Sequence, residues 1–308
     1  MPGKRQVASS EPLWRGMHPF GRRRLLAALA ALGAMGGAAG AFSRASAAAS
    51  REVRFGLTPV FLSSDLELLT RLRAYLAGAL DRPVTLVTRR TYQEITALLL
   101  SGQLDAAWIC GYPFIQYRER LSLVAVPVWR GSPLYQSYLI VDHDRQVAGL
   151  PDLRGDIHAF SDPDSNSGHL VTQAALAEIR ETPDAFFGKT FFTYSHRNVV
   201  RAVASGLAQS GSVDGYVWEV MSEIEPALTA GTRVLRKSEW LGFPPVACAK
   251  TAGHRALADD IRRAPVAMGD DPAGRAVLDL LRLDGFTPGD AGLFDGIAHN
   301  LDLVRSLG

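Results

Sequence analysis

Short apolar runs alternate along the chain with segments whose apolar residues recur at helical spacing. VRFGLTP at 53–59, VTLVTRR at 84–90 and AAWIC at 106–110 have the length and composition of strands. Between them, the leucines from Leu66 to Leu80 and the segment 92–100 each place apolar side chains on one face of a helix. Two further runs, LSLVAVPVW and YLIVDHD, continue the strands. This alternation is typical of an α/β protein with helices on both faces of a parallel sheet.

The same plan appears a second time after residue 150. Strands are predicted at 155–160, 189–196, 212–218 and 233–240, and helices at 169–180, 198–207 and 221–228. FPPVACAK predicts one more strand, and the C-terminal segment is predicted to be mostly helical, with turns at DDPAG and FTPGD. A mature chain of this length suits two lobes.

The N-terminal residues 1–47 differ in kind from the rest. A basic stretch ending in GRRRLL runs into the weakly apolar LLAALAALGAMGGAAGAF and then into Ala45-Ser46-Ala47, an arrangement typical of a cleaved export signal. The paired arginines and low hydropathy resemble a twin-arginine signal. A retained membrane anchor is the alternative, but the apolar run is short and rich in glycine and alanine. We therefore predict export to the periplasm.

Removal of this segment reverses the sign of the charge. The whole chain has 33 basic and 31 acidic residues, a formal charge of +2, whereas 26 basic and 30 acidic residues follow residue 47, a formal charge of −4. No basic patch for nucleic acid is expected on such a chain. Cys110 and Cys248 are far apart, and the residues leave open whether they form a disulfide. Metal-binding motifs of recognisable spacing are absent, and we expect no cofactor.

The loop FSDPDSNSGHL at 160–170 is the strongest candidate for chemistry. Open parallel sheets bind ligands beyond the carboxyl ends of their strands, where loops lead into helices. Here an Asp-Pro pair ends a strand, and Ser165, Asn166 and Ser167 occupy the N-cap region of the next helix. The unpaired amides of a helix start suit an anion, and Gly168 would let a ligand approach the backbone closely. The alternative is that these side chains only cap the helix.

Six segments occur in a recognisable order over residues 52–225: VRFGLTP, SGQLDAAWICGYPFIQY, GSPLYQSYLIVDHD, DPDSNSGHL, FFGKTFFTYSHRNVVRAVASG and SVDGYVWEV. As a set, they resemble the phosphate, phosphite and phosphonate-binding family of transporter-associated periplasmic receptors. The resemblance implies a type II periplasmic binding fold, in which two α/β lobes clamp a ligand in a cleft and two crossing strands form the hinge. YQSYLIVDH and PPVACAK are the implied crossovers. Lobe 1 would then comprise residues 48–140 and 246–308, and lobe 2 residues 141–245.

The resemblance also implies which residues hold the ligand. Its oxyanion would lie on Ser165, Asn166 and Ser167 and their backbone amides, with Tyr112 from the other lobe and His196 as further donors. Asn166 stands where threonine is commoner in the family, so the identity of the ligand is left open. Beside an anion, His196 would gain a proton more readily or serve as a neutral donor. Core packing is the alternative for Tyr112, and a structural bond is the alternative for His196.

Tyr216 and Cys110 are two further candidates. In the predicted strand, Asp214, Tyr216 and Trp218 alternate onto one face, where Tyr216 would either read the far end of the ligand or pack on a helix. Cys110 directly precedes the Gly-Tyr pair that the resemblance places at the ligand. A thiol suits soft elements, and some members of the wider family resemble sensors that capture arsenite through a cysteine in this region. The alternative is an ordinary buried cysteine.

Together these patterns predict a non-enzymatic, monomeric receptor that closes around a small oxyanion of the phosphonate, phosphite or phosphate type and delivers it to an ABC transporter permease. One alternative is an oxyanion sensor, for example of arsenite, that partners a membrane histidine kinase. Another is a hydrolase that uses Ser165 or Ser167 with His196 and Asp214. No G-x-S-x-G motif is present, and serines at a helix start donate to anions more naturally than they attack carbonyls.

Overall fold

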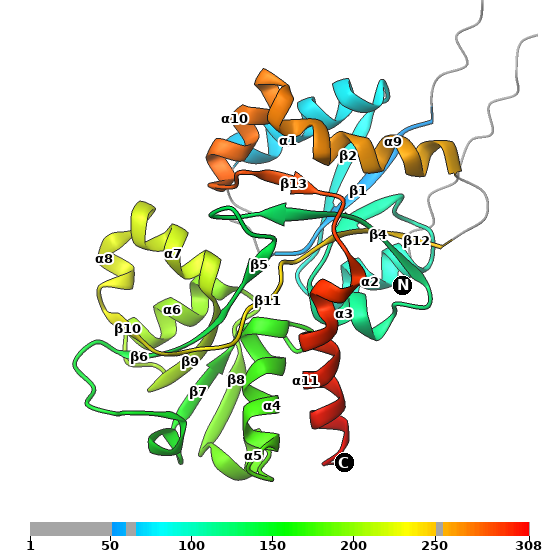
Figure 1. Cartoon of the computed structure of the whole chain (residues 1–308). Coiled ribbons are helices and arrows are strands. Elements are labelled where there is room, and N and C mark those ends of the chain that lie inside the picture. The colour runs from blue at the N-terminus through cyan, green and yellow to red at the C-terminus, as the bar shows by residue number, and fades with distance from the viewer. Residues whose placement is uncertain (1–50, 60–65, 251–254, 308) are drawn as a thin grey trace, which may run out of the picture. The chain divides into compact units, whose positions relative to one another are not determined.

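The computed structural model describes residues 51–59, 66–250 and 255–307, so the predicted export signal lies outside the described residues. Among the helices of this part of the chain, none is long and apolar enough to cross a membrane. Two α/β sheets with helices packed on them account for most of the described residues (Figure 1).

The first sheet has six strands in the order β13-β4-β12-β3-β1-β2. β1 pairs in parallel with β2 and β3, whereas β12 runs antiparallel to both β3 and β4. The strands are β1 (Val53–Leu57), β2 (Val84–Thr88), β3 (Ala106–Trp108), β4 (Leu121–Val128), β12 (Val246–Ala249) and β13 (Gly285–Thr287). The associated helices are α1 (Leu66–Leu80), α2 (Tyr92–Leu100), α3 (Gly111–Gln116), α9 (Arg255–Val266), η3 (Ala267–Asp270) and α10 (Pro272–Leu281).

The second sheet has five strands in the order β10-β6-β9-β7-β8. β7 lies parallel to β8 and β9, and β6 lies antiparallel to β9 and β10. The strands are β6 (Ser137–Asp142), β7 (Ile157–Phe160), β8 (Lys189–Phe192), β9 (Ser210–Asp214) and β10 (Thr232–Lys237). The helical elements are η1 (Leu150–Leu153), the π-helical turn η2 (Asn166–Leu170), α4 (Val171–Ala177), α5 (Pro183–Phe186), α6 (His196–Ala204), α7 (Gly215–Ile224) and α8 (Pro226–Thr229).

Two antiparallel strands, β5 (Leu134–Tyr135) and β11 (Leu241–Gly242), lie where the chain passes between the sheets. The chain leaves the first sheet after β4 and returns through β11 to β12, close to the two predicted crossovers. The proposed lobe boundary at residue 140 falls inside β6, and Ser137 already pairs with Asp214 of the second sheet. The strand pairing therefore divides the chain before Ser137 rather than at 140.

The C-terminal helix α11 (Asp295–Arg305), preceded by η4 (Ala291–Phe294), does not belong to one sheet alone. It packs against α3 of the first lobe and against α4 and η2 of the second, and Figure 1 shows it alongside α4. The predicted assignment of 246–308 to lobe 1 therefore does not describe the contacts of this helix.

Two local predictions are wrong, and both concern chain that leaves a strand. The predicted strand 212–218 ends at Asp214, and the helix α7 begins at Gly215 because the Asp214 carboxylate accepts the Val217 amide and caps it. The glycine and proline on either side of Tyr112 predict a turn from the sequence, whereas these residues form the first turn of α3, with proline near its start. In both cases aromatic and β-branched residues concealed a helix start.

Candidate functional site

Four helices begin at one place between the two sheets. α2 starts at Tyr92 behind a Thr91–Glu94 capping box, and α6 starts at His196. The Tyr92 hydroxyl lies 3.2 Å from His196 Nε2, and the Asp214 amide at the start of α7 donates to His196 Nδ1 at 3.0 Å. η2, which continues into α4, starts beside them behind Ser165. Helix starts carry unpaired amides and the positive end of the helix dipole, so their convergence favours an anion.

The predicted serine-rich loop lies at this meeting point, and its residues 165–168 are buried. Ser165 Oγ accepts the Gly168 amide at 3.0 Å, so Ser165 is the N-cap, as the capping interpretation predicts. Asn166 links three elements, because its amide N–H donates to Cys110 Sγ at 3.2 Å and its Nδ2 to the Tyr135 hydroxyl at 2.9 Å. The Ser167 carbonyl accepts the Ser137 hydroxyl at 2.6 Å. Ser165 therefore caps the loop, while Asn166 and Ser167 tie it to the neighbouring elements.

Gly168 is required by packing rather than by space for a ligand. A Cβ at this position would lie 1.8 Å from Ser161 Oγ and 3.0 Å from His196 Cε1. The Ser161 side chain therefore occupies the space that the sequence interpretation had reserved for a ligand.

His196 is held as a neutral imidazole. Because Nδ1 accepts the Asp214 N–H, the ring proton is on Nε2, where it donates to the Tyr92 hydroxyl oxygen. Burial lowers the pKa of His196 from 6.5 to about 3. His196 is therefore neutral, but its Nε2–H is directed to Tyr92, which is the structural bond given as the alternative, and this bond leaves the Tyr92 hydrogen available to donate onward.

Two buried carboxyl groups flank these donors. Asp162 Oδ2 accepts the Tyr92 amide at 3.1 Å across the two lobes, and its side chain is 1% exposed. Burial raises the pKa of Asp162, and it raises the pKa of Asp214 from 3.8 to about 7. We call the residues that meet here the inter-lobe cluster: Tyr92, Cys110, Tyr135, Asp162, Ser165, Asn166, Ser167, His196 and Asp214. It contains no lysine or arginine.

Cys110 is a buried thiol at the N-cap of α3, 2% exposed. Burial is the largest influence on its pKa, which is raised to about 12 despite amide donors from Asn166 and Tyr112. Cys248 is also a free thiol, and the register of β12 against β3, with Ala247 opposite Ala107, carries it away from Cys110. Within the described residues, no group of three His, Cys, Asp or Glu side chains could hold a metal ion.

We expect the Cys110 thiol to react slowly in the native protein. A pKa of about 12 in place of 9.0 lowers the thiolate fraction about a thousandfold near neutral pH. In a Cys248→Ser background, a thiol–disulfide reagent should therefore react at least about 100-fold more slowly with native than with denatured protein. Equal rates in the two states would contradict the buried, protonated thiol.

The remaining two predicted site residues, Tyr112 and Tyr216, adjoin the inter-lobe cluster through their backbone amides, which bond to the Cys110 thiol and to the Asp214 carboxylate. Tyr112 is half-buried on the first turn of α3, where Asp164 and Arg305 act on its hydroxyl. Tyr216 is in helix α7 rather than in a strand, and its hydroxyl donates to the Leu281 carbonyl of α10 at 2.5 Å. Its ring packs edge-on against Trp129 and Phe243. The packing alternative for Tyr216 is therefore the one that its contacts support.

Sequence reasoning missed Tyr92, Tyr135 and Asp162 as members of the site. Tyr92 had been placed on the apolar face of α2, and Tyr135 had been considered only as part of a crossover. Both rings are buried, yet each hydroxyl meets a polar partner from the second lobe. A tyrosine directly after a helix cap was the only available signal, and it is weak.

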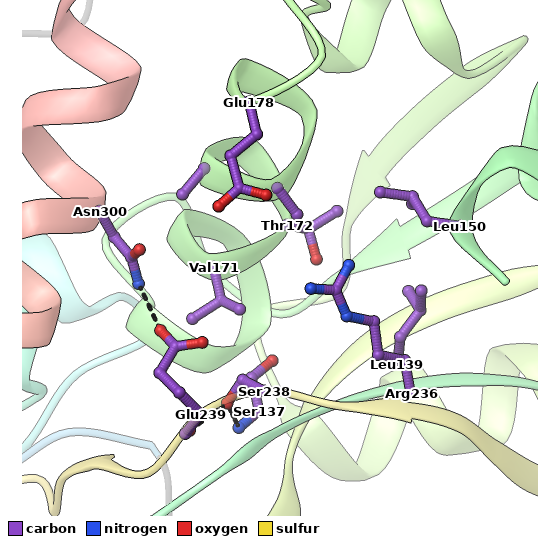
Figure 2. A pocket seen from close by; sticks show the side chains of 12 residues that line it. Ser137, Leu139, Leu150, Val171, Thr172, Glu178, Arg236, Ser238, Glu239 and Asn300 are labelled. Carbon is purple, nitrogen blue, oxygen red and sulfur yellow. Dashed lines mark hydrogen bonds between the residues drawn. The ribbon is translucent and has the colours of Figure 1, made fainter.

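A pocket of about 50 Å³ lies between β6, α4, β10 and α11 (Figure 2). Figure 2 shows the Asn300 amide donating to Glu239 at 3.3 Å on one side of it. None of the residues of the inter-lobe cluster lines this pocket.

Two α/β lobes joined by two crossing segments, with polar groups of both lobes meeting between them, define the type II periplasmic binding fold. The profile of the family described as "ABC transporter, phosphonate, periplasmic substrate-binding protein" matches residues 55–293. The chain belongs to this family, which confirms the family resemblance and the fold predicted from the sequence.

Solved structures agree with this fold. A binding protein component of an ABC phosphonate transporter from Pseudomonas aeruginosa superposes with a TM-score of 0.76 at 19% identity, over 83% of this chain and 87% of that one. A Prochlorococcus marinus protein in complex with methylphosphonate gives 0.73 at 16% identity, over 83% and 98%. A histidine kinase sensor domain with similarity to periplasmic binding proteins gives 0.53 at 14%, over 75% and 96%.

Proposed function

We propose that the mature protein is a monomeric periplasmic receptor that clamps a small oxyanion of the phosphonate, phosphite or phosphate type between its lobes and delivers it to an ABC transporter permease. The observation that carries this proposal is the inter-lobe cluster, where neutral donors from both lobes meet at four helix starts. Export by the twin-arginine route is part of the same proposal and rests on residues 1–47 alone.

The hydrogen-bond directions support this role. Tyr92 accepts from His196, so it keeps its own O–H to donate to an anion, and Tyr135 accepts from Asn166 while its hydroxyl also bonds to the Ser167 side chain. Preorganised neutral donors bind an oxyanion strongly in a buried site because water does not compete there. We propose Ser165, Asn166 and Ser167 as ligand residues together with these two tyrosines, and His196 as the residue that acts through the Tyr92 hydroxyl it orients.

Closure would couple binding to the position of the lobes. The Tyr92–Asp162 and Tyr92–His196 bonds join the first lobe to the second, so they belong to a closed arrangement. A ligand that completes the cluster would shift the population toward closure, which is the form a permease can recognise.

The test is a thermal-shift and calorimetric panel of phosphate, phosphite, methylphosphonate, aminoethylphosphonate, sulfate and arsenite. A ligand that binds only the folded state must raise the melting temperature. At 100 times its Kd, it increases the free energy of unfolding by about 2.7 kcal/mol. No response to any of these anions at millimolar concentration would end the proposal.

We expect Ser167→Ala to weaken the response to the best ligand by at least about tenfold in Kd, because a hydrogen bond to a charged group is lost. Its unliganded stability should fall by about 1 kcal/mol, because the buried Ser167 hydroxyl also forms a hydrogen bond with Tyr135. Ser165→Ala should also cost about 1 kcal/mol of stability, through loss of the cap.

Thr182→Ala, which removes the cap of α5, is the matched control: it should cost stability without changing Kd. Unchanged ligand binding by both Ser165→Ala and Ser167→Ala would limit this loop to capping.

The sensing alternative shares the fold but depends on Cys110 as a soft ligand. Against it, the thiol is protonated and already accepts the Asn166 amide. Arsenite binding that is lost in Cys110→Ser would favour sensing, as would a neighbouring kinase gene. The hydrolase alternative is opposed by bonding, because His196 contacts Tyr92 and the Asp214 backbone while Ser165 Oγ serves the Gly168 amide.

A further inference from the structure

The Asn166 side chain carries a buried acceptor that nothing else in the described chain satisfies. Its Nδ2 donates to the Tyr135 hydroxyl and its backbone N–H to Cys110 Sγ, whereas Oδ1 has no hydrogen-bond partner among the described residues. Asn166 is 0% exposed. Buried polar atoms are nearly always paired, so this one indicates a partner that the described residues do not provide.

The position of this acceptor is inside the inter-lobe cluster. Oδ1 and Nδ2 share one carbon, and Nδ2 lies 2.9 Å from the Tyr135 hydroxyl, one of the donors proposed for the ligand. A second unpartnered buried atom, Ser161 Oγ, lies in the same strand-to-helix segment beneath Gly168. An anion that accepts hydrogen bonds from the tyrosines would therefore also lie beside Asn166 Oδ1, an oxygen that can accept a hydrogen bond but cannot donate one.

The charges around Asn166 act in the same direction. The titratable groups that face it are Tyr92, Cys110, Tyr135, Asp162, His196 and Asp214. His196 is neutral by its hydrogen bonds, and none of the six provides a positive charge. Helix α11, which also packs against η2, contributes Arg305 near Tyr112, where Asp164 opposes it. A doubly charged ligand would face carboxyl groups without a cation to offset them.

We propose that the site binds its oxyanion in the singly charged, protonated form, with Asn166 Oδ1 accepting the ligand O–H. The inference rests on the proposed function, since it names the charge state of that ligand. Asn166 thereby becomes the residue that separates phosphonates, which carry such a proton, from sulfonates of the same shape, which do not. A site with a buried acceptor rejects a ligand that lacks the matching donor, because the acceptor is left unpaired.

The experiment is isothermal calorimetry of the mature protein with three ligands of similar shape: methylphosphonate, trifluoromethylphosphonate and methanesulfonate. We expect methanesulfonate to bind at least about 100-fold more weakly than methylphosphonate below the second ionisation of the phosphonate. Above that ionisation, the Kd of methylphosphonate should rise about tenfold per pH unit, because only the protonated fraction binds.

Trifluoromethylphosphonate separates titration of the ligand from titration of the protein. Fluorine makes its second ionisation more acidic, so the pH at which its affinity begins to fall should be lower than for methylphosphonate. If both ligands lose affinity around one common pH, a protein group such as Asp214 is responsible and the inference is wrong. Equal affinities for methanesulfonate and methylphosphonate would mean that the Asn166 amide presents its NH₂ to the ligand, and this result would also overturn the inference.

Asn166→Thr provides the matching variant, because a hydroxyl can donate to a deprotonated oxygen as well as accept. In this variant the Kd for methylphosphonate at high pH should come within about tenfold of its value at low pH. Asn300→Thr is the control at another buried asparagine, in the pocket of Figure 2, and should keep the wild-type pH dependence. Binding of phosphonates without this pH dependence leaves the receptor function intact, whereas failure of every ligand at every pH overturns both.

Discussion

Gly168→Ala is expected to lower the free energy of unfolding by about 3 kcal/mol, at the upper end of the range for overpacked cores. The added Cβ would lie 1.8 Å from Ser161 Oγ and 2.7 Å from Ser161 Cβ, and His196 Cε1 closes the other side at 3.0 Å. Because β7 and η2 are both buried here, neither backbone can shift to relieve the clash without disturbing the packing around it. Thermal or denaturant unfolding of the unliganded protein measures the effect, about 2–4 °C of melting temperature per kcal/mol for a domain of this size.

Two further variants identify the cause. Ser161→Gly in the Gly168→Ala background removes the atoms that clash and should restore more than half of the lost stability. Gly78→Ala is the matched control, since its new Cβ would meet nothing within 4 Å in helix α1, and it should be neutral or stabilise by up to about 1 kcal/mol. A Gly168→Ala protein as stable as wild type would show that the loop is not packed as described.

Asp214→Asn should make the protein more stable at neutral and alkaline pH, by an amount that grows between about pH 4 and pH 7 and is constant above it. Burial raises the pKa of Asp214 in the folded state to about 7, above its ordinary value of 3.8, so the folded state holds this proton more tightly than the unfolded chain. The contribution of Asp214 to stability is complete below pH 4 and is lost as the pH rises to about 7. An asparagine keeps the oxygen that caps α7 but cannot ionise.

The measurement is the difference in unfolding free energy between Asp214→Asn and wild type across this range. It should increase by about 1.4 kcal/mol per pH unit between about pH 4 and pH 7 and be constant outside it. For His158→Gln, the difference in unfolding free energy from wild type should increase as the pH falls, which is the opposite direction. Burial lowers the pKa of His158 to about 3 in the folded state, so the unfolded chain takes up this proton at a higher pH than the folded protein does. A difference for Asp214→Asn that is equal at pH 4 and pH 8 would contradict a buried carboxyl at this position.

The elements of the fold were largely predictable because their apolar periodicity is strong. The helix at Leu66–Leu80 and the strand at Val53–Leu57 were predicted at their observed positions. The errors at 212–218 and 111–113 arise where a strand passes into a helix with almost no intervening loop, so that even the Asp214 cap of α7 was assigned to the strand. There, the side-chain period of the strand and the first turn of the helix both fit the same few residues.

The candidate site was predictable only in its loop. Ser165, Asn166 and Ser167 stand out in sequence because polar residues cluster after a strand-ending proline. Tyr135 could not be found in this way, since its only signal is a neighbour, Asn166, 31 positions away along the chain. Tyr216 shows the opposite error. Its position two residues after Asp214 in a predicted strand made it a candidate, whereas in the fold its ring packs against Trp129 and Phe243.

The sequence by itself determined the α/β alternation, the family and the anion-suited loop, because these depend on residues that are near one another in the chain. The tertiary structure decided the protonation of His196, the partners of Asn166 and the reason for Gly168. These properties depend on which groups from distant elements share a buried volume, and desolvation and hydrogen-bond direction act only there. For the same reason, a single asparagine could be recognised as a helix-start residue from the sequence and as an unpaired acceptor only from the fold.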